Sequence, residues 1–83
     1  MIFKANVTVM PQPEILDPQG KAVEQALHQI GIGSAQNVRI GKRIEFLIEA
    51  DSEKLAFDKV TEASKGLLAK VIMENFKVEL ELN

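Results

Sequence analysis

Apolar and polar residues alternate in three separate stretches of this 83-residue chain, one near each end and one in the middle. A period of two predicts a strand with one buried face and one exposed face. The first such stretch covers residues 2–10, the second residues 37–50 and the third residues 74–82. Strands of this kind need other elements to cover their apolar face, which is the strongest constraint on the fold.

The segment between the first two stretches is predicted to form a helix over residues 18–30. Asp17 suits the N-cap, and Pro18 suits the first helical position, where its missing N–H costs nothing. The apolar residues that follow at helical spacing are Ala22, Val23, Ala26, Leu27 and Ile30. Gly31 is the expected C-cap, and residues 31–36 are expected to form a loop.

A second helix is expected to begin after Asp51 or Ser52, either of which suits an N-cap. The residues expected on its buried face are Ala56, Val60, Ala63 and Leu67. Gly66 lies near its end and weakens it by about 1 kcal/mol relative to alanine.

The order of elements predicts one α+β domain over residues 1–83, with the pattern β-α-β(β)-α-β. Gly41-Lys42 interrupts the middle stretch, which leaves open a hairpin or a bulge in one long strand. We expect an antiparallel sheet with two helices on one face, as in ferredoxin-like folds. The last strand is apolar enough to be an edge that pairs with another copy.

Composition excludes several classes of function. A net charge of −2, with 10 Lys and Arg against 12 Asp and Glu, gives no basic face for nucleic acid. No cysteine is present, so disulfides and thiolate chemistry are excluded. No apolar run approaches the roughly 20 residues of a membrane span, and no signal peptide opens the chain. We therefore expect a cytoplasmic protein that binds neither nucleic acid nor membrane.

The inventory of catalytic groups is poor, and we predict no catalytic, cofactor or metal site. His28 is the single histidine, and no serine lies in a nucleophile motif. Glu24 and His28 are four residues apart, but a zinc site needs at least three protein ligands. We interpret them as a local side-chain pair or as part of a subunit contact. Residues 31–33 and 41–43 lack the rest of either nucleotide-binding glycine motif.

A small basic cluster surrounds Gly41 and consists of Arg39, Lys42 and Arg43. One interpretation is an ordinary solvated strand end. The alternative is a contact with an acidic patch on a partner or with a phosphate, because arginine pairs well with planar anions.

Three segments together resemble the signature of PurS-type subunits of formylglycinamidine ribonucleotide synthase. Residues 16–28 read Leu-Asp-Pro-Gln-Gly-x-Ala-Val-x-x-Ala-Leu-His, and residues 38–42 read Val-Arg-Ile-Gly-Lys at the family's spacing. Residues 67–76 resemble the family's closing segment. There the family usually has Asn in place of Lys70, and an acidic residue followed by Tyr in place of Asn75-Phe76.

The resemblance implies a PurS-like fold whose copies associate as dimers or tetramers by joining sheets. It also implies two partners, an ATP-using synthase subunit of the PurL type and a glutaminase subunit of the PurQ type. The assembled ligase amidates formylglycinamide ribonucleotide during purine (IMP) synthesis. ATP with magnesium and glutamine are used by the partner subunits, and the small subunit contributes no known catalytic residue. Its implied role is to bridge the two large subunits and to help ammonia pass between them.

The residues expected at a partner interface belong to the two best-matched segments. They are Asp17, Pro18, Gly20, His28, Arg39, Gly41 and Lys42. Asp17, Pro18 and Gly20 either shape the start of the helix or contact the synthase subunit. Arg39 and Lys42 are the strongest candidates for a polar interface, and His28 is a weaker third. An alternative function is a small ACT-like regulatory module that binds an amino acid, which rests on fold analogy alone.

Overall fold

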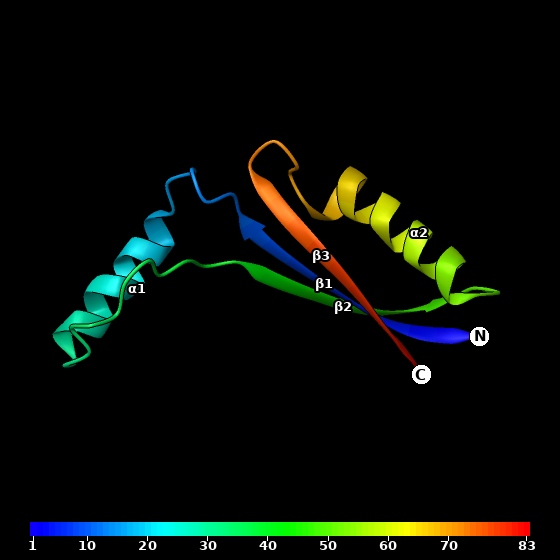
Figure 1. Cartoon of the computed structure of the whole chain (residues 1–83), viewed down its shortest axis with the longest axis horizontal. Helices are drawn as coiled ribbons and strands as arrows, with labels where there is room; N and C mark the ends of the chain where they lie inside the picture. The colour runs from blue at the N-terminus through cyan, green and yellow to red at the C-terminus, as the bar shows by residue number, and fades with distance from the viewer.

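The computed structural model describes the whole chain, residues 1–83, as a three-stranded antiparallel sheet with two helices. The elements in chain order are β1 (Ile2–Pro11), α1 (Pro18–Gln29), β2 (Lys42–Glu49), α2 (Glu53–Ala63), the π-helical turn η1 (Ser64–Leu68) and β3 (Glu74–Leu82). Strand β1 lies in the centre, with β2 and β3 at the two edges (Figure 1). The predicted α+β class and element order are confirmed.

The register of the sheet places the apolar residues of all three strands on one face. Ala5 lies opposite Phe46 on β2 and Leu80 on β3. The same register places charged residues on the other face, where Asn6 lies between Glu45 and Glu79. The sheet therefore has one face for a core and one polar face.

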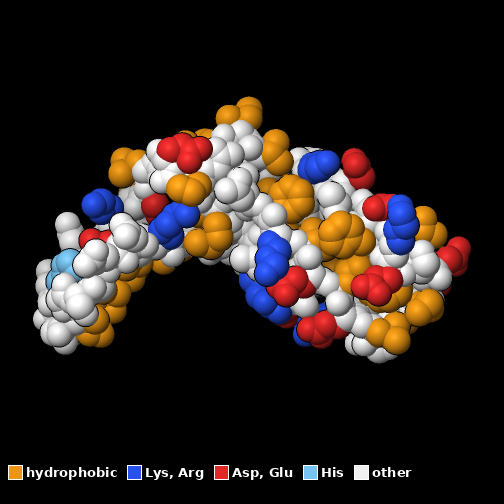
Figure 2. Space-filling model, viewed as in Figure 1, with side chains coloured by type: hydrophobic (Ala, Val, Ile, Leu, Met, Phe, Trp, Pro, Cys, Tyr) orange, Lys and Arg blue, Asp and Glu red, His pale blue; other side chains and the backbone are white.

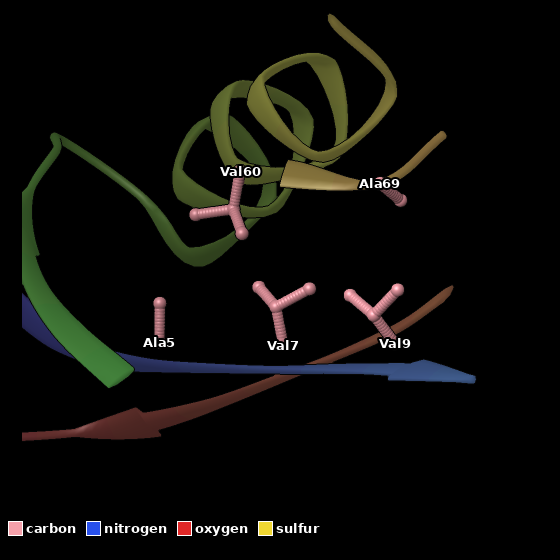
Figure 3. Close-up of a cluster of buried hydrophobic side chains, with 5 residues drawn as sticks. All are labelled: Ala5, Val7, Val9, Val60 and Ala69. Atoms are coloured by element: carbon pink, nitrogen blue, oxygen red, sulfur yellow. The ribbon is translucent and has the colours of Figure 1, made fainter. Parts of the chain in front are cut away.

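Helix α2 covers the apolar face of the sheet. Figure 3 shows Val60 pointing from α2 toward Ala5, Val7 and Val9 of β1, with Ala69 closing one end. These five side chains are buried and form the larger of two core clusters. The smaller cluster, Phe3, Ala50 and Ala56, lies at the other end of the same face.

The turn η1 changes which residues of the second helical segment are buried. The N–H of Ala69 donates to the carbonyl of Ser64 over 2.9 Å, five residues back, so the turn holds one residue more than an α-turn. The buried face therefore runs through Ser64 to Ala69, and Leu67 is 83% exposed. The prediction that Leu67 faces the core is wrong for this reason.

Residues 37–41 do not belong to the sheet, so the middle strand is shorter than the predicted 37–50. The structure has one strand here, β2, and no hairpin at Gly41-Lys42. The N–H groups of Val38 and Ile40 are bonded to side chains of the α1 region instead of a neighbouring strand. Those bonds hold residues 35–41, hereafter the return segment, beside α1.

Helix α1 lies beyond one end of the sheet, and the prediction that both helices cover one face is wrong for α1. Figure 1 shows α1 and the return segment as a limb that projects from the end of β1 and β2. The molecule is an arch of 50 × 27 × 14 Å with a radius of gyration of 16.2 Å. A compact chain of this length has a radius of gyration of about 12 Å. The physical reason is that α1 uses its polar face to hold the return segment.

No helix of the structure has the length and apolar character needed to cross a membrane.

Candidate partner interface

Asp17 fastens the start of α1 to the return segment. One carboxylate oxygen, Oδ1, accepts from the N–H of Gly20 over 2.9 Å, which is the predicted N-cap bond. The other, Oδ2, accepts from the N–H of Ile40 over 2.7 Å. These two bonds, together with the positive charge of Arg39, hold the pKa of Asp17 below its ordinary value. Asp17 therefore caps α1 and also links the helix to the return segment.

Glu24 and His28 continue the same hydrogen-bonded seam along α1. Oε1 of Glu24 accepts from the N–H of Val38 over 3.2 Å. Nε2 of His28 lies 2.8 Å from the carbonyl oxygen of Ala35, so Nε2 carries the hydrogen in this bond. The two side chains share a helical face as predicted, but each contacts the return segment.

Two of the predicted interface glycines lie where two backbones meet closely. A Cβ on Gly20 would lie 2.2 Å from the carbonyl oxygen of Val38, and one on Gly41 would lie 2.3 Å from that of Val9. Gly20 lets α1 approach the return segment, and Gly41 lets the return segment cross the end of β1. Pro18 is exposed in the first turn of α1. Because proline has no backbone N–H, it donates no hydrogen bond to the return segment.

The basic cluster predicted around Gly41 is divided between the limb and the sheet. Arg39 is half-buried on the return segment, and its Nη2 is buried with no hydrogen-bond partner in the chain. Lys42 is exposed at the start of β2. The next residue, Arg43, forms a 2.7 Å ion pair with Glu45 on the polar face of the sheet, which raises the pKa of the guanidinium. Arg39 is thus the one member of the cluster that accompanies Asp17.

A surface pocket of about 370 Å³ lies between the loop before α1 and the return segment. Its lining includes Asp17, Glu24 and Arg39, together with Lys21 of α1. The remaining lining residues are Pro13, Ile15, Leu16, Gln36, Asn37 and Val38. Asn37 has a φ of 56°, a left-handed conformation that asparagine tolerates better than most residues. Gly41 and Lys42 line a separate, smaller pocket with Gln19, Ile40 and Glu74.

The structure also exposes apolar residues that the sequence analysis assigned to a core or left unassigned. On α1, Val23 is 38% and Ile30 73% exposed, although both belong to the predicted apolar stripe. At the turn before β3, Ile72 is 87% exposed beside Val71 and Met73. The sequence carried no signal for this exposure, because an apolar stripe opposite Asp17, Glu24 and His28 is equally typical of a helix that packs on its own sheet.

No group of three or more histidine, cysteine, aspartate or glutamate side chains is arranged to hold a metal ion. The limb presents backbone, carboxylate and guanidinium groups beside exposed apolar side chains. Such a surface can contact another protein chain.

Comparisons with known proteins match the same family over almost the whole chain. The family model described as "PurS: Phosphoribosylformylglycinamidine (FGAM) synthase" matches residues 4–82. The phosphoribosylformylglycinamidine synthase subunit PurS of Bacillus subtilis (strain 168) is 39% identical over 80 residues, which cover 96% of this chain and 94% of that protein. The corresponding subunit of Synechocystis sp. is 36% identical over 78 residues, covering 94% and 78%.

Solved structures of such subunits have the same fold. The B. subtilis PurS structure aligns with a TM-score of 0.82 at 38% identity, covering 96% of this chain and 99% of that chain. A chain in the structure of PurLQS from Thermotoga maritima aligns with a TM-score of 0.89 at 26% identity, covering 98% and 99%.

Proposed function

This chain belongs to the PurS family, the PurS subunits of phosphoribosylformylglycinamidine synthase in purine biosynthesis, and we propose on that premise that it is the non-catalytic assembly subunit of such an enzyme. It bridges an ATP-dependent synthase subunit of the PurL type and a glutaminase subunit of the PurQ type. It associates with copies of itself and supports the transfer of ammonia between the two large subunits. The observation that carries the proposal is the family match over residues 4–82.

The partners are inferred from the structural likeness. The T. maritima structure that aligns with this chain is described as PurLQS, so that protein assembles with PurL and PurQ. The alignment covers 98% of this chain, including the limb that carries the predicted interface residues. We infer the same two kinds of partner here.

The shape of the chain supports a bridging role. Only 11 of 83 residues are buried, so most side chains are available for contact with other chains. Exposed apolar residues include Leu16 and Ile30 at the two ends of α1 and Ile72 at the turn before β3. Exposed apolar residues of this kind commonly mark contacts with other protein chains.

A bridging subunit has a clear chemical purpose in this reaction. Ammonia released from glutamine is mostly protonated in water at neutral pH, and ammonium is a poor nucleophile. A sealed path between the two large subunits keeps ammonia neutral and excludes water. In our proposal this chain forms part of that seal, and the ATP with magnesium and the glutamine are bound by the partners.

The test is reconstitution from purified components. The chain is mixed with PurL-type and PurQ-type subunits, Mg-ADP and glutamine, and both glutamine-dependent amidation and the mass of the complex are measured. We expect a stable complex and full activity only when the chain is present. Equal activity and assembly without the chain would overturn the proposal.

The predicted interface residues are tested in the same assay. Arg39→Ala removes a buried guanidinium nitrogen that has no partner within the chain, and Lys42→Ala removes an exposed charge. We expect either change to weaken complex formation about tenfold, because an interfacial charge left unpaired is costly. Lys59→Ala on α2 is the matched control, because Lys59 is exposed and has no ion pair in the structure. An equal loss of complex formation for Lys59→Ala would show that the effect is not specific to the predicted interface residues.

A further inference from the structure

The turn between η1 and β3 has apolar residues where a turn normally has polar ones. The carbonyl of Lys70 accepts from the N–H of Met73 over 2.8 Å, which closes a turn with Val71 and Ile72 at its centre. Such central positions are usually occupied by Gly, Pro, Asn, Asp or Ser. Here Val71 is 50% and Ile72 87% exposed, so neither residue contributes fully to the chain's own core. A departure from local turn chemistry without a gain in packing is typical of a functional surface.

Hydrogen bonds from both sides fix the shape of this turn. The carbonyl of Lys70 also accepts from the N–H of Glu74 over 2.7 Å, and the carboxylate of Glu74 accepts from the N–H of Lys70 over 2.7 Å. Gln12, the residue after β1, donates its N–H to the carbonyl of Met73 over 2.8 Å and its Nε2 to that of Val71 over 3.1 Å. The apolar turn is therefore preorganised, and a partner that binds it does not have to order it first.

A surface hollow of about 380 Å³ lies beside the turn and combines apolar walls with two positive charges. It is lined by Ala69, Val71, Ile72 and Met73, together with Lys65 and Lys70. Both lysines are exposed, and neither forms an ion pair in the structure. Figure 2 shows hydrophobic side chains at the top of the arch, where Figure 1 places this turn. The hollow thus lacks both an apolar cover and counter-charges within its own chain.

We propose that this hollow docks an acidic segment of a large partner subunit, which inserts an apolar side chain beside Ile72 and pairs its carboxylates with Lys65 and Lys70. The inference deepens the bridging role in the proposed function and rests on it. The surface lies on η1 and the turn, separate from the interface residues predicted on the limb. A second copy is a poorer occupant, because a two-fold contact through the turn would bring the lysines of both copies together.

The first test places a charge at the centre of the turn. Ile72→Asp should keep the fold, because the side chain is 87% exposed. The matched control is Leu67→Asp, which alters a residue that is 83% exposed but does not line the hollow. Calorimetry with PurL-type and PurQ-type subunits, Mg-ADP and glutamine should show binding about tenfold weaker or more for Ile72→Asp and unchanged for Leu67→Asp. Wild-type affinity for Ile72→Asp, or an equal loss for Leu67→Asp, would overturn the inference.

Sedimentation of the same variant without the large subunits tests the second copy as occupant. Ile72→Asp should have the wild-type mass, with its secondary structure intact by circular dichroism. A smaller mass would show that a second copy covers the turn, and the proposed occupant would be wrong.

The second test concerns the charges. Lys70→Glu reverses one charge of the hollow, and Lys59→Glu on α2 is the matched control. Binding of the large subunits should weaken about tenfold for Lys70→Glu at low ionic strength, and the difference should narrow at about 1 M salt, where charges are screened. Lys59→Glu should bind as wild type does. Wild-type binding by Lys70→Glu at low ionic strength would show that the docked segment is not acidic.

The third test locates the contact directly. The chain has no cysteine, so Ile72→Cys carries a single thiol for a benzophenone cross-linker. In the assembled complex, the cross-link should join the turn to a stretch of one large subunit that is rich in Asp and Glu. Cross-linking only to a second copy of this chain would overturn the inference.

The two proposals fail in distinguishable ways. If reconstituted activity requires the chain but Ile72→Asp and Lys70→Glu assemble as wild type does, the assembly role stands and only the docking site is wrong. If activity does not require the chain at all, the proposed function is wrong whatever the affinity of the variants.

Discussion

The half of the molecule formed by the sheet and α2 and the limb formed by α1 and the return segment are stabilised in opposite ways. In the first half, apolar side chains such as Val7 and Val60 meet in a core that excludes water. In the limb, the carboxylates of Asp17 and Glu24 bind backbone N–H groups, and the apolar side chains face outward. The comparison teaches that one half is held by a buried apolar core, whereas the other is held by hydrogen bonds to its own backbone and leaves apolar side chains exposed.

The largest effect is expected from damage to the core of the first half. Val7 is fully buried at the centre of the sheet, so Val7→Ala should lower the free energy of unfolding by about 2 kcal/mol through lost burial and a cavity. Urea unfolding at fixed protein concentration measures this. Leu67→Ala removes a larger side chain that is 83% exposed and should stay within about 0.5 kcal/mol of wild type. A comparable loss for Leu67→Ala would mean that η1 is packed differently.

The next effect should break the limb without breaking the core. Gly20→Ala places a Cβ 2.2 Å from the carbonyl oxygen of Val38, so the return segment must move, at a cost of about 1–2 kcal/mol. Amide hydrogen exchange should accelerate at Val38 and Ile40 while β1 stays protected. Gly33→Ala is the control in the same limb, because a Cβ there meets nothing within 4 Å. Uniform acceleration across the sheet would contradict the separation of the two halves.

A smaller effect, dependent on pH, should distinguish the hydrogen-bonded limb from the apolar core. The pKa of Asp17 is lowered in the folded chain, so its carboxylate stabilises the limb above the unfolded pKa, and that contribution is lost as pH falls through the folded pKa. Asp17→Asn should lower the Tm at pH 7 by about 5 °C. The difference between wild type and variant should shrink below about pH 4. A difference that is constant with pH would show that the charge of Asp17 contributes nothing.

The smallest effect is expected at the far end of the limb. His28→Ala removes one exposed hydrogen bond to Ala35 and should cost about 0.5 kcal/mol in urea unfolding. Gln29→Ala, the next residue on the helix, is the control. A loss well above 1 kcal/mol for His28→Ala would mean that the seam acts as one cooperative unit along α1.

The sequence predicted the first half well, because its signals are local. The alternation of Phe3, Ala5, Val7 and Val9 identified the central strand and its buried face, and Ser52 caps α2 as one of two expected residues. Asp17 as N-cap was also confirmed, whereas the C-cap of α1 is Ile30, and the predicted Gly31 follows it with a φ of 97°. Each of these features depends on neighbours within a few residues.

The limb was predicted less well, because its arrangement depends on contacts far apart in the sequence. The bond from Ile40 to Asp17 spans 23 residues, and it removes residues 37–41 from the sheet. The apolar stripe of α1 was taken as a sign of the chain's own core, whereas the structure exposes it. Apolar spacing identifies the face that is to be buried but carries no information on which chain buries it.

The π-helical turn η1 has a consequence for how chain length can vary among related proteins. Because the turn already contains one residue more than an α-turn, deletion of one residue between Ser64 and Ala69 would convert it to an ordinary α-turn. Ala69 would then stay on the buried face, and β3 would keep its register. A single-residue gap is therefore tolerated inside this helical segment, where insertions and deletions normally rotate every residue that follows.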